Sequence, residues 1–164
     1  MDTAIRRQIL MVSKGKMIFT GIDQQTVELS ITNYEFPDIN NHWDANWLLV
    51  YLKVQSKLGN WQTIDPSLTT WELQELIEWF LDLADDQKPE LNPMEFTEPN
   101  LSFHHLYALD NKKIIRIRFE LESRPQSASD DREYFVDCDL TNSDLQEIAE
   151  ELTKELARFP KRPL

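Results

Sequence analysis

Alternating hydrophobic and polar positions recur along this chain and predict most of its strands. In residues 26–32, Val27, Leu29 and Ile31 share one face, while Thr, Glu and Ser side chains occupy the other. A period of two is typical of a strand with one buried face. The same pattern predicts further strands at residues 17–19, 46–55, 101–107, 113–122 and 134–138.

One of these strands, residues 113–122, has a marked two-faced character. Its apolar face is expected to bury Ile115, Ile117, Phe119 and Leu121, whereas arginines and glutamates occupy the opposite face. The pair Asp110-Asn111 between residues 107 and 113 is typical of a hairpin turn. The two flanking strands are therefore expected to pair antiparallel.

Two segments have the 3.6-residue spacing of amphipathic helices. The first follows a capping box, Thr69-x-x-Glu72, and continues to about residue 84. The second is expected to begin near residues 141–143, whose hydroxyls can cap it, with Asp144 in its first turn. Pro160 prevents its continuation. The predicted buried stripes are Leu73, Leu76, Ile77, Phe80 and Ala84 in the first helix, and Leu145, Ile148, Ala149, Leu152 and Leu156 in the second.

The order of strands, helix, strands and helix predicts an α+β fold. Short hairpin links favour a mostly antiparallel β-sheet of about six to eight strands, with two α-helices packed on one face. Residues 85–93 and 124–131 are rich in proline and polar residues and are expected to be surface loops. The length of 164 residues is typical of a single domain, 1–164. We expect the first 15 residues to be a loosely ordered extension.

Composition places the chain among cytoplasmic globular proteins. Hydrophobic residues make up 41% and charged residues 28% of the sequence, which is too apolar for intrinsic disorder. The sequence has neither a signal-peptide pattern nor an apolar window long enough to span a membrane. The single cysteine, Cys138, excludes a disulfide framework and fits a reducing compartment.

The net charge of −12 limits the choice of partner. A chain this acidic is a poor ligand for nucleic acid or an anionic membrane, because both are bound through Lys and Arg. It would attract a basic protein and speed the encounter with it. The alternative is that the charge serves solubility alone.

The stretch HWDANWLLVYLKV, residues 42–54, breaks the rule of one apolar face. One face is wholly apolar, and the other carries Trp47, a leucine and Tyr51 before it becomes polar. Either Trp43 and Trp47 cap the core while Asp44 fixes the turn, or this strip contacts a partner through its aromatic side chains. The candidate contact residues here are Trp43, Asp44, Asn46, Trp47 and Tyr51.

Three glutamates of the second helix form another candidate surface. Glu147, Glu150 and Glu151 are expected on its outer face, either simply solvated or docking a cationic partner.

No residue pattern points to catalysis, a metal or a cofactor. His104 and His105 are adjacent, so in a regular strand they point to opposite faces and cannot chelate one ion. Cys138 shares the apolar face of its strand with Tyr134 and Val136, which predicts a buried thiol. Asp137 and Asp139 flank it and disfavour the thiolate that a nucleophile requires. Phosphate-binding and dinucleotide-binding glycine patterns are absent from the sequence.

Several segments together resemble the WapI-type immunity proteins of bacterial contact-dependent polymorphic toxin systems. The similarity lies in Tyr34-Glu-Phe-Pro-Asp, in His42-Trp-Asp-Ala-Asn-Trp-Leu, and in the strand and capped helix that follow, ending near Trp79. It is strongest over residues 34–80, and the first 15 residues have no counterpart. The resemblance implies a non-catalytic cytoplasmic protein that binds and neutralises a cognate toxin domain, typically a nuclease and here expected to be basic.

Two other functions remain open at this stage. An acidic adaptor with an unknown partner would have the same composition, and an enzyme of unrecognised type would require a deep pocket with convergent polar groups. The sequence leaves the oligomeric state open, because an uncovered sheet edge can pair with another copy.

Overall fold

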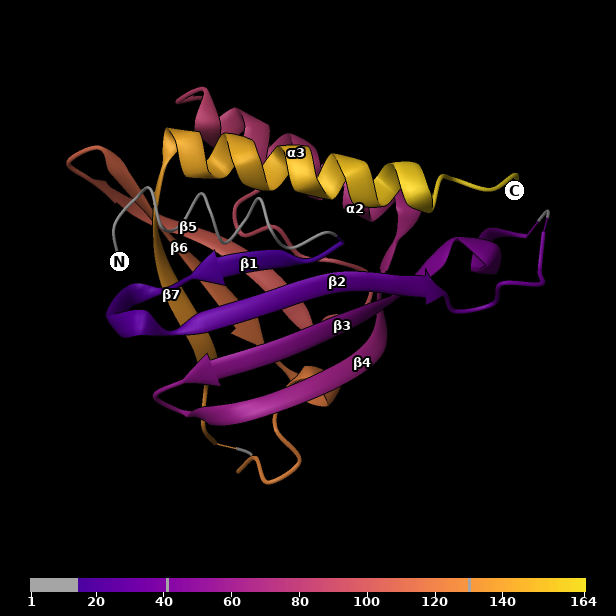
Figure 1. Cartoon of the computed structure of the whole chain (residues 1–164), viewed down its shortest axis with the longest axis horizontal. Coiled ribbons are helices and arrows are strands. Elements are labelled where there is room, and N and C mark those ends of the chain that lie inside the picture. The colour runs from indigo at the N-terminus through magenta and orange to yellow at the C-terminus, as the bar shows by residue number, and fades with distance from the viewer. Residues whose placement is uncertain (1–14, 41, 130) are drawn as a thin grey trace.

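The computed structural model describes residues 15–40, 42–129 and 131–164. In these residues it contains seven strands and two α-helices, with three short 3-10 helices in the connections (Figure 1). The predicted loose extension, residues 1–15, lies outside the described residues except for Gly15. The elements in chain order are β1 (Met17–Thr20), η1 (Ile22–Gln24), β2 (Thr26–Tyr34), η2 (Trp43–Asn46), β3 (Trp47–Ser56), β4 (Gly59–Thr69), α2 (Thr70–Ala84), β5 (Leu101–Leu109), β6 (Lys112–Phe119), η3 (Leu121–Ser123), β7 (Tyr134–Thr141) and α3 (Asn142–Arg158).

The strands form two antiparallel sheets rather than a single one. The first has the order β1-β2-β3-β4 and the second the order β5-β6-β7, and neighbours in each sheet are also neighbours in sequence. Figure 1 shows the four-stranded sheet in front of the three-stranded one, with α2 and α3 side by side along one side of both. The predicted α+β class with antiparallel strands is confirmed.

One hydrophobic core joins the two sheets and both helices. Phe19 of β1 lies 6.1 Å, between ring centroids, from Phe80 of α2 and from Phe103 of β5. Where β1 ends, the chain passes close to β7: a Cβ added at Gly21 would lie 2.7 Å from the Val136 side chain. Any larger residue at this position would therefore push the edges of the two sheets apart.

Both helices begin with a complete capping box, which the sequence predicts for α2; for α3 it predicts only a capping hydroxyl and Asp144 in the first turn. Thr69 accepts a hydrogen bond from the Glu72 amide, and the Glu72 carboxylate accepts one from the Thr69 amide. Thr141 and Asp144 make the same reciprocal pair at the start of α3. Each box satisfies backbone donors that a helix start otherwise leaves unpaired.

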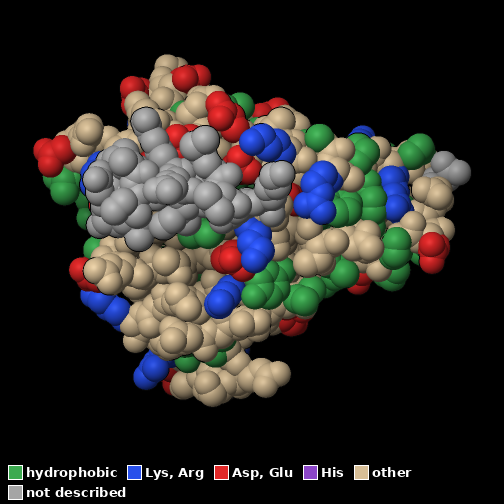
Figure 2. All heavy atoms as spheres, viewed as in Figure 1, with side chains coloured by type: hydrophobic (Ala, Val, Ile, Leu, Met, Phe, Trp, Pro, Cys, Tyr) green, Lys and Arg blue, Asp and Glu red, His purple; other side chains and the backbone are tan. Residues whose placement is uncertain are grey.

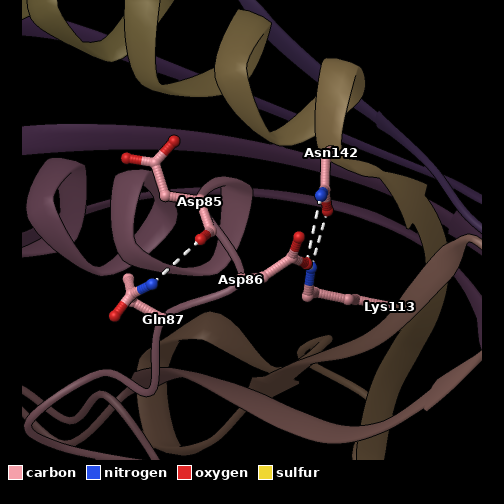
Figure 3. A network of polar contacts seen from close by, with 5 residues as sticks. All are labelled: Asp85, Asp86, Gln87, Lys113 and Asn142. Carbon is pink, nitrogen blue, oxygen red and sulfur yellow. Dashed lines mark hydrogen bonds and ion pairs between the residues drawn. The ribbon is translucent and has the colours of Figure 1, made fainter.

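A polar network fixes the far end of α2 to α3 and to β6 (Figure 3). The Asp86 carboxylate accepts hydrogen bonds from Lys113 Nζ at 2.6 Å and from the Asn142 amide at 3.1 Å. Lys113 and Asn142 hold the pKa of Asp86 below its usual value, because both stabilise its charged form. The network joins three elements that are far apart in sequence.

Two details of the sequence prediction need correction. The strand β4 is missing from it, because only Trp61 in its first half is buried and Pro66 interrupts the pattern. Proline is tolerated here because β4 is an edge strand. Leu121 does not share the buried face of β6: the strand ends at Phe119, and Leu121 has a φ of 49° and an exposed side chain.

Candidate functional site

Three tryptophans lie together where the β2–β3 connection meets the start of α2. The Trp43 ring lies 5.9 Å from that of Trp47 and 6.3 Å from that of Trp71, between centroids. Trp43 is 47% exposed, whereas Trp47 beneath it is only 9% exposed. We call Trp43, Trp47 and Trp71 the aromatic surface. Trp71 comes from a different element and was not among the predicted contact residues.

Within the described part of the chain, another ring covers the apolar strip predicted on β3 only at its beginning. Trp43 covers Trp47, while Leu49 and Tyr51 are half-buried on the same strand. Tyr51 is paired with Ser30 on one side and with Ile64 of β4 on the other. The Ile64 side chain is exposed, so the strip widens onto a strand that the sequence did not reveal.

The short helix η2 orients Trp43 and Asp44. His42 precedes it, and its Nδ1 accepts a hydrogen bond from the Asp44 amide at 3.2 Å. The Asp44 carboxylate lies 3.5 Å from the same His42 nitrogen and is partly exposed. The His42 side chain therefore caps the turn through the backbone amide of Asp44, and the Asp44 carboxylate stays partly exposed.

Asn46, another predicted contact residue, is fully buried. Its side-chain oxygen accepts hydrogen bonds from the Thr70 hydroxyl at 2.8 Å and the Arg162 amide at 2.8 Å, and its NH₂ donates to the Arg162 carbonyl. All of these partners belong to the fold itself. Asn46 is therefore placed to hold the segment in position rather than to meet a partner directly.

The C-terminal tail clamps the β2–β3 connection. The Arg162 guanidinium donates hydrogen bonds to the carbonyls of Phe36, Pro37 and Ile39 and lies 3.5 Å above the Tyr34 ring. The side chains of Phe36 and Ile39 remain exposed. Figure 2 shows hydrophobic side chains beside Lys and Arg side chains on the visible face of this end.

Glu35 lies beside the aromatic surface, because its amide donates a hydrogen bond to the Trp47 carbonyl at 2.8 Å. Partial burial raises the pKa of Glu35, and the negative charges of Asp44 and Glu98 raise it further. The surroundings of Glu35 therefore disfavour its charged form.

The glutamates predicted as a second contact surface lie on another element. Glu150 is exposed, Glu147 and Glu151 are half-buried, and Glu151 pairs with Lys154 at 2.8 Å. The structure thus brings Trp43 and Trp47 into contact, whereas the three glutamates belong to α3.

The described residues include no group of three or more His, Cys, Asp or Glu side chains arranged to hold a metal ion. His104 is hydrogen-bonded to Ser102 at 2.8 Å, and burial lowers the pKa of both His104 and His105. Cys138 is fully buried, as predicted. None of the helices in the described part of the chain is long and apolar enough to cross a membrane.

Exposed tryptophan side chains such as Trp43 belong to the residue types enriched at protein–protein interfaces. The family model described as the immunity protein WapI-like family matches residues 17–160, and the chain belongs to this family. The family implies toxin neutralisation and is typically non-catalytic, in agreement with the sequence prediction. No curated protein and no solved structure matches the chain.

Proposed function

We propose that this protein binds a cognate toxin domain in the cytoplasm, covers the surface by which the toxin acts, and so neutralises it without chemistry. The proposed target is a basic domain, for instance a nuclease that must hold phosphate groups. The net charge of −12 supports this choice, because an acidic protein accelerates its encounter with a basic one.

The aromatic surface is the proposed centre of the contact. The observation that carries this assignment is Trp43, which is held by a capped turn and yet leaves nearly half of its surface in water. Tryptophan and tyrosine dominate binding energies because they bury much area and lose little rotamer freedom. Trp43, Trp47, Asp44 and Tyr51 would meet the toxin, and Asn46 would fix their position.

The glutamates of α3 are proposed as an outer acidic surface that guides the approach. Exposed charges at the rim of an interface change association rates more than they change dissociation rates. Neutralising Glu150 alone should therefore slow binding slightly and leave the dissociation rate unchanged.

The direct test uses a candidate toxin domain, taken from the gene that lies next to the gene for this protein. Expression of that domain alone should stop growth, and co-expression of this protein should restore it through a one-to-one complex. Absence of both rescue and complex would reject the proposal. A stable complex without rescue would favour an acidic adaptor instead.

A further inference from the structure

A cavity of about 380 Å³ opens between the outer face of α2 and the segment that leads to β5. Among the residues that the structure describes, its lining contains four carboxylates and no Lys or Arg side chain. The lining residues are Glu75, Glu78, Trp79, Asp82, Pro89, Glu90, Leu91 and Met94.

The floor of this cavity is apolar and held in place by hydrogen bonds. The Trp79 indole donates to the Leu91 carbonyl at 2.8 Å. Met94 pairs through its backbone with Phe103 of β5, and both Trp79 and Met94 are buried. The Asn92 side chain exchanges two hydrogen bonds of 2.9 Å with the backbone of His105. The floor is therefore formed before any ligand arrives.

The rim is negatively charged on both sides. Glu75, Glu78 and Asp82 are spaced by three and four residues and so share one face of α2, while Glu90 comes from the facing segment. Burial raises the pKa of Glu75, and the charges of Glu72, Glu78 and Glu90 raise it further. A cation between these groups would relieve their mutual repulsion.

The shape and lining of the cavity select one kind of cation. A metal ion needs several ligands within reach of a single point, and the described residues contain no such cluster. A Lys or Arg side chain instead combines an apolar stem with a charged head. Its stem would lie mainly on the exposed Leu91 beside the buried Trp79 and Met94, and its head would reach the carboxylates of the rim.

The cavity continues the aromatic surface along the same helix. Trp71 and Glu75 are one turn apart on α2, and Asp82 lies eleven residues beyond Trp71. At 1.5 Å per residue this is about 16 Å along the helix, within the width of an ordinary protein interface. One partner can therefore cover both.

We propose that this cavity receives a Lys or Arg side chain of the toxin. The aromatic surface would then pack against apolar side chains of the toxin that lie near this Lys or Arg. The inference rests on the proposed function, since it names a second contact for the same partner.

A small cation tests the cavity without any toxin. In ¹H–¹⁵N NMR spectra, butylguanidinium should shift the Trp79 indole signal saturably, whereas neutral butylurea should shift it far less. The double variant Glu75→Gln/Glu78→Gln should weaken this response at least fivefold. The matched control Glu122→Gln/Glu133→Gln removes two exposed charges near η3 and β7 and should leave the response unchanged. An absent Trp79 response, or equal responses in the two variants, would overturn the inference.

The toxin domain encoded beside the gene separates the two proposals. If it binds the wild type, Glu75→Gln/Glu78→Gln should weaken the complex at least tenfold while the control variant binds normally. Equal affinities of both variants would reject the cavity as a contact and leave the immunity function intact. If the wild type does not bind the toxin at all, the proposed function fails, and the butylguanidinium titration alone decides whether the cavity takes a cationic side chain.

Discussion

Asn46 and Arg162, 116 residues apart in sequence, are joined by two hydrogen bonds in which each residue both donates and accepts. The Asn46 side chain thus binds the backbone of the C-terminal tail in the way a neighbouring strand would. The tail then delivers the Arg162 guanidinium to three carbonyls of the β2–β3 connection. The position of the aromatic surface consequently depends on the last few residues of the chain.

Arg162→Ala should loosen the β2–β3 connection without unfolding the protein. The three hydrogen bonds are partly exposed, so we expect a loss of about 1 kcal/mol, which corresponds to a Tm lower by about 2–4 °C. Amide exchange should accelerate in residues 36–40 while β6 keeps its protection. The exposed neighbour Lys161→Ala serves as control, and equal behaviour of the two variants would contradict the role of Arg162.

Trp43→Ala separates a contact role from a core-capping role. If Trp43 meets the toxin, the complex should weaken at least tenfold, or about 1.4 kcal/mol, and Tm should change little. Titration calorimetry and thermal melts measure both quantities. Tyr107→Ala removes an exposed aromatic of β5 and should affect neither. A large fall in Tm with unchanged affinity would show that Trp43 only covers the core.

Glu72→Ala should lower the free energy of unfolding by more than the loss of a helix cap alone would, because Glu72 also binds a second segment of the chain. The buried Glu72 carboxylate caps Thr69 and also accepts a hydrogen bond from the Thr97 amide at 2.7 Å. Its removal leaves two backbone donors unpaired, and we expect a cost of about 2 kcal/mol. Urea unfolding of this variant, compared with the exposed Gln74→Ala, measures the difference.

Glu155 should make stability depend on pH. Burial raises its pKa in the folded state, although Arg158 at 3.1 Å and the Ile31 backbone partly oppose this. The folded protein then holds the proton more tightly than the unfolded chain does. The resulting stabilisation is complete when the pH is below 4.5, the ordinary pKa of a glutamate. It disappears as the pH rises through the raised pKa of the folded state.

Glu155→Gln removes this titration. The stability of wild type relative to the variant should therefore decrease as the pH is raised from 4 towards neutral. Thermal melts of both proteins at several pH values test this, and a constant difference across the range would show that Glu155 has an unshifted pKa.

Charge should control how fast the toxin binds. The net charge of −12 acts over distance only at low ionic strength, because the screening length is about 8 Å at physiological salt. The association rate in stopped-flow measurements should fall steeply with added NaCl, while the dissociation rate changes little. A salt-independent association rate would mean that the charge serves solubility alone.

The sequence by itself determined the elements that follow local rules. Both capping boxes, the stripe of α2, and the alternation in β2, β3 and β7 depend on residues close together in the chain. Such patterns report which face of an element is buried. These patterns were also sufficient to predict the α+β class. The residues of segment 34–80 were sufficient to indicate the family.

Tertiary structure alone decided where these elements meet. The division into two sheets, the place of β4 at an edge, and the contact of Trp43 with Trp71 depend on pairings between distant residues. Likewise, the sequence alone predicts that Asn46 is a polar loop residue. In the folded protein Asn46 is buried and hydrogen-bonded to Arg162, which is distant in sequence. Periodicity shows that a side chain must be covered, but only the packed fold determines which group covers it.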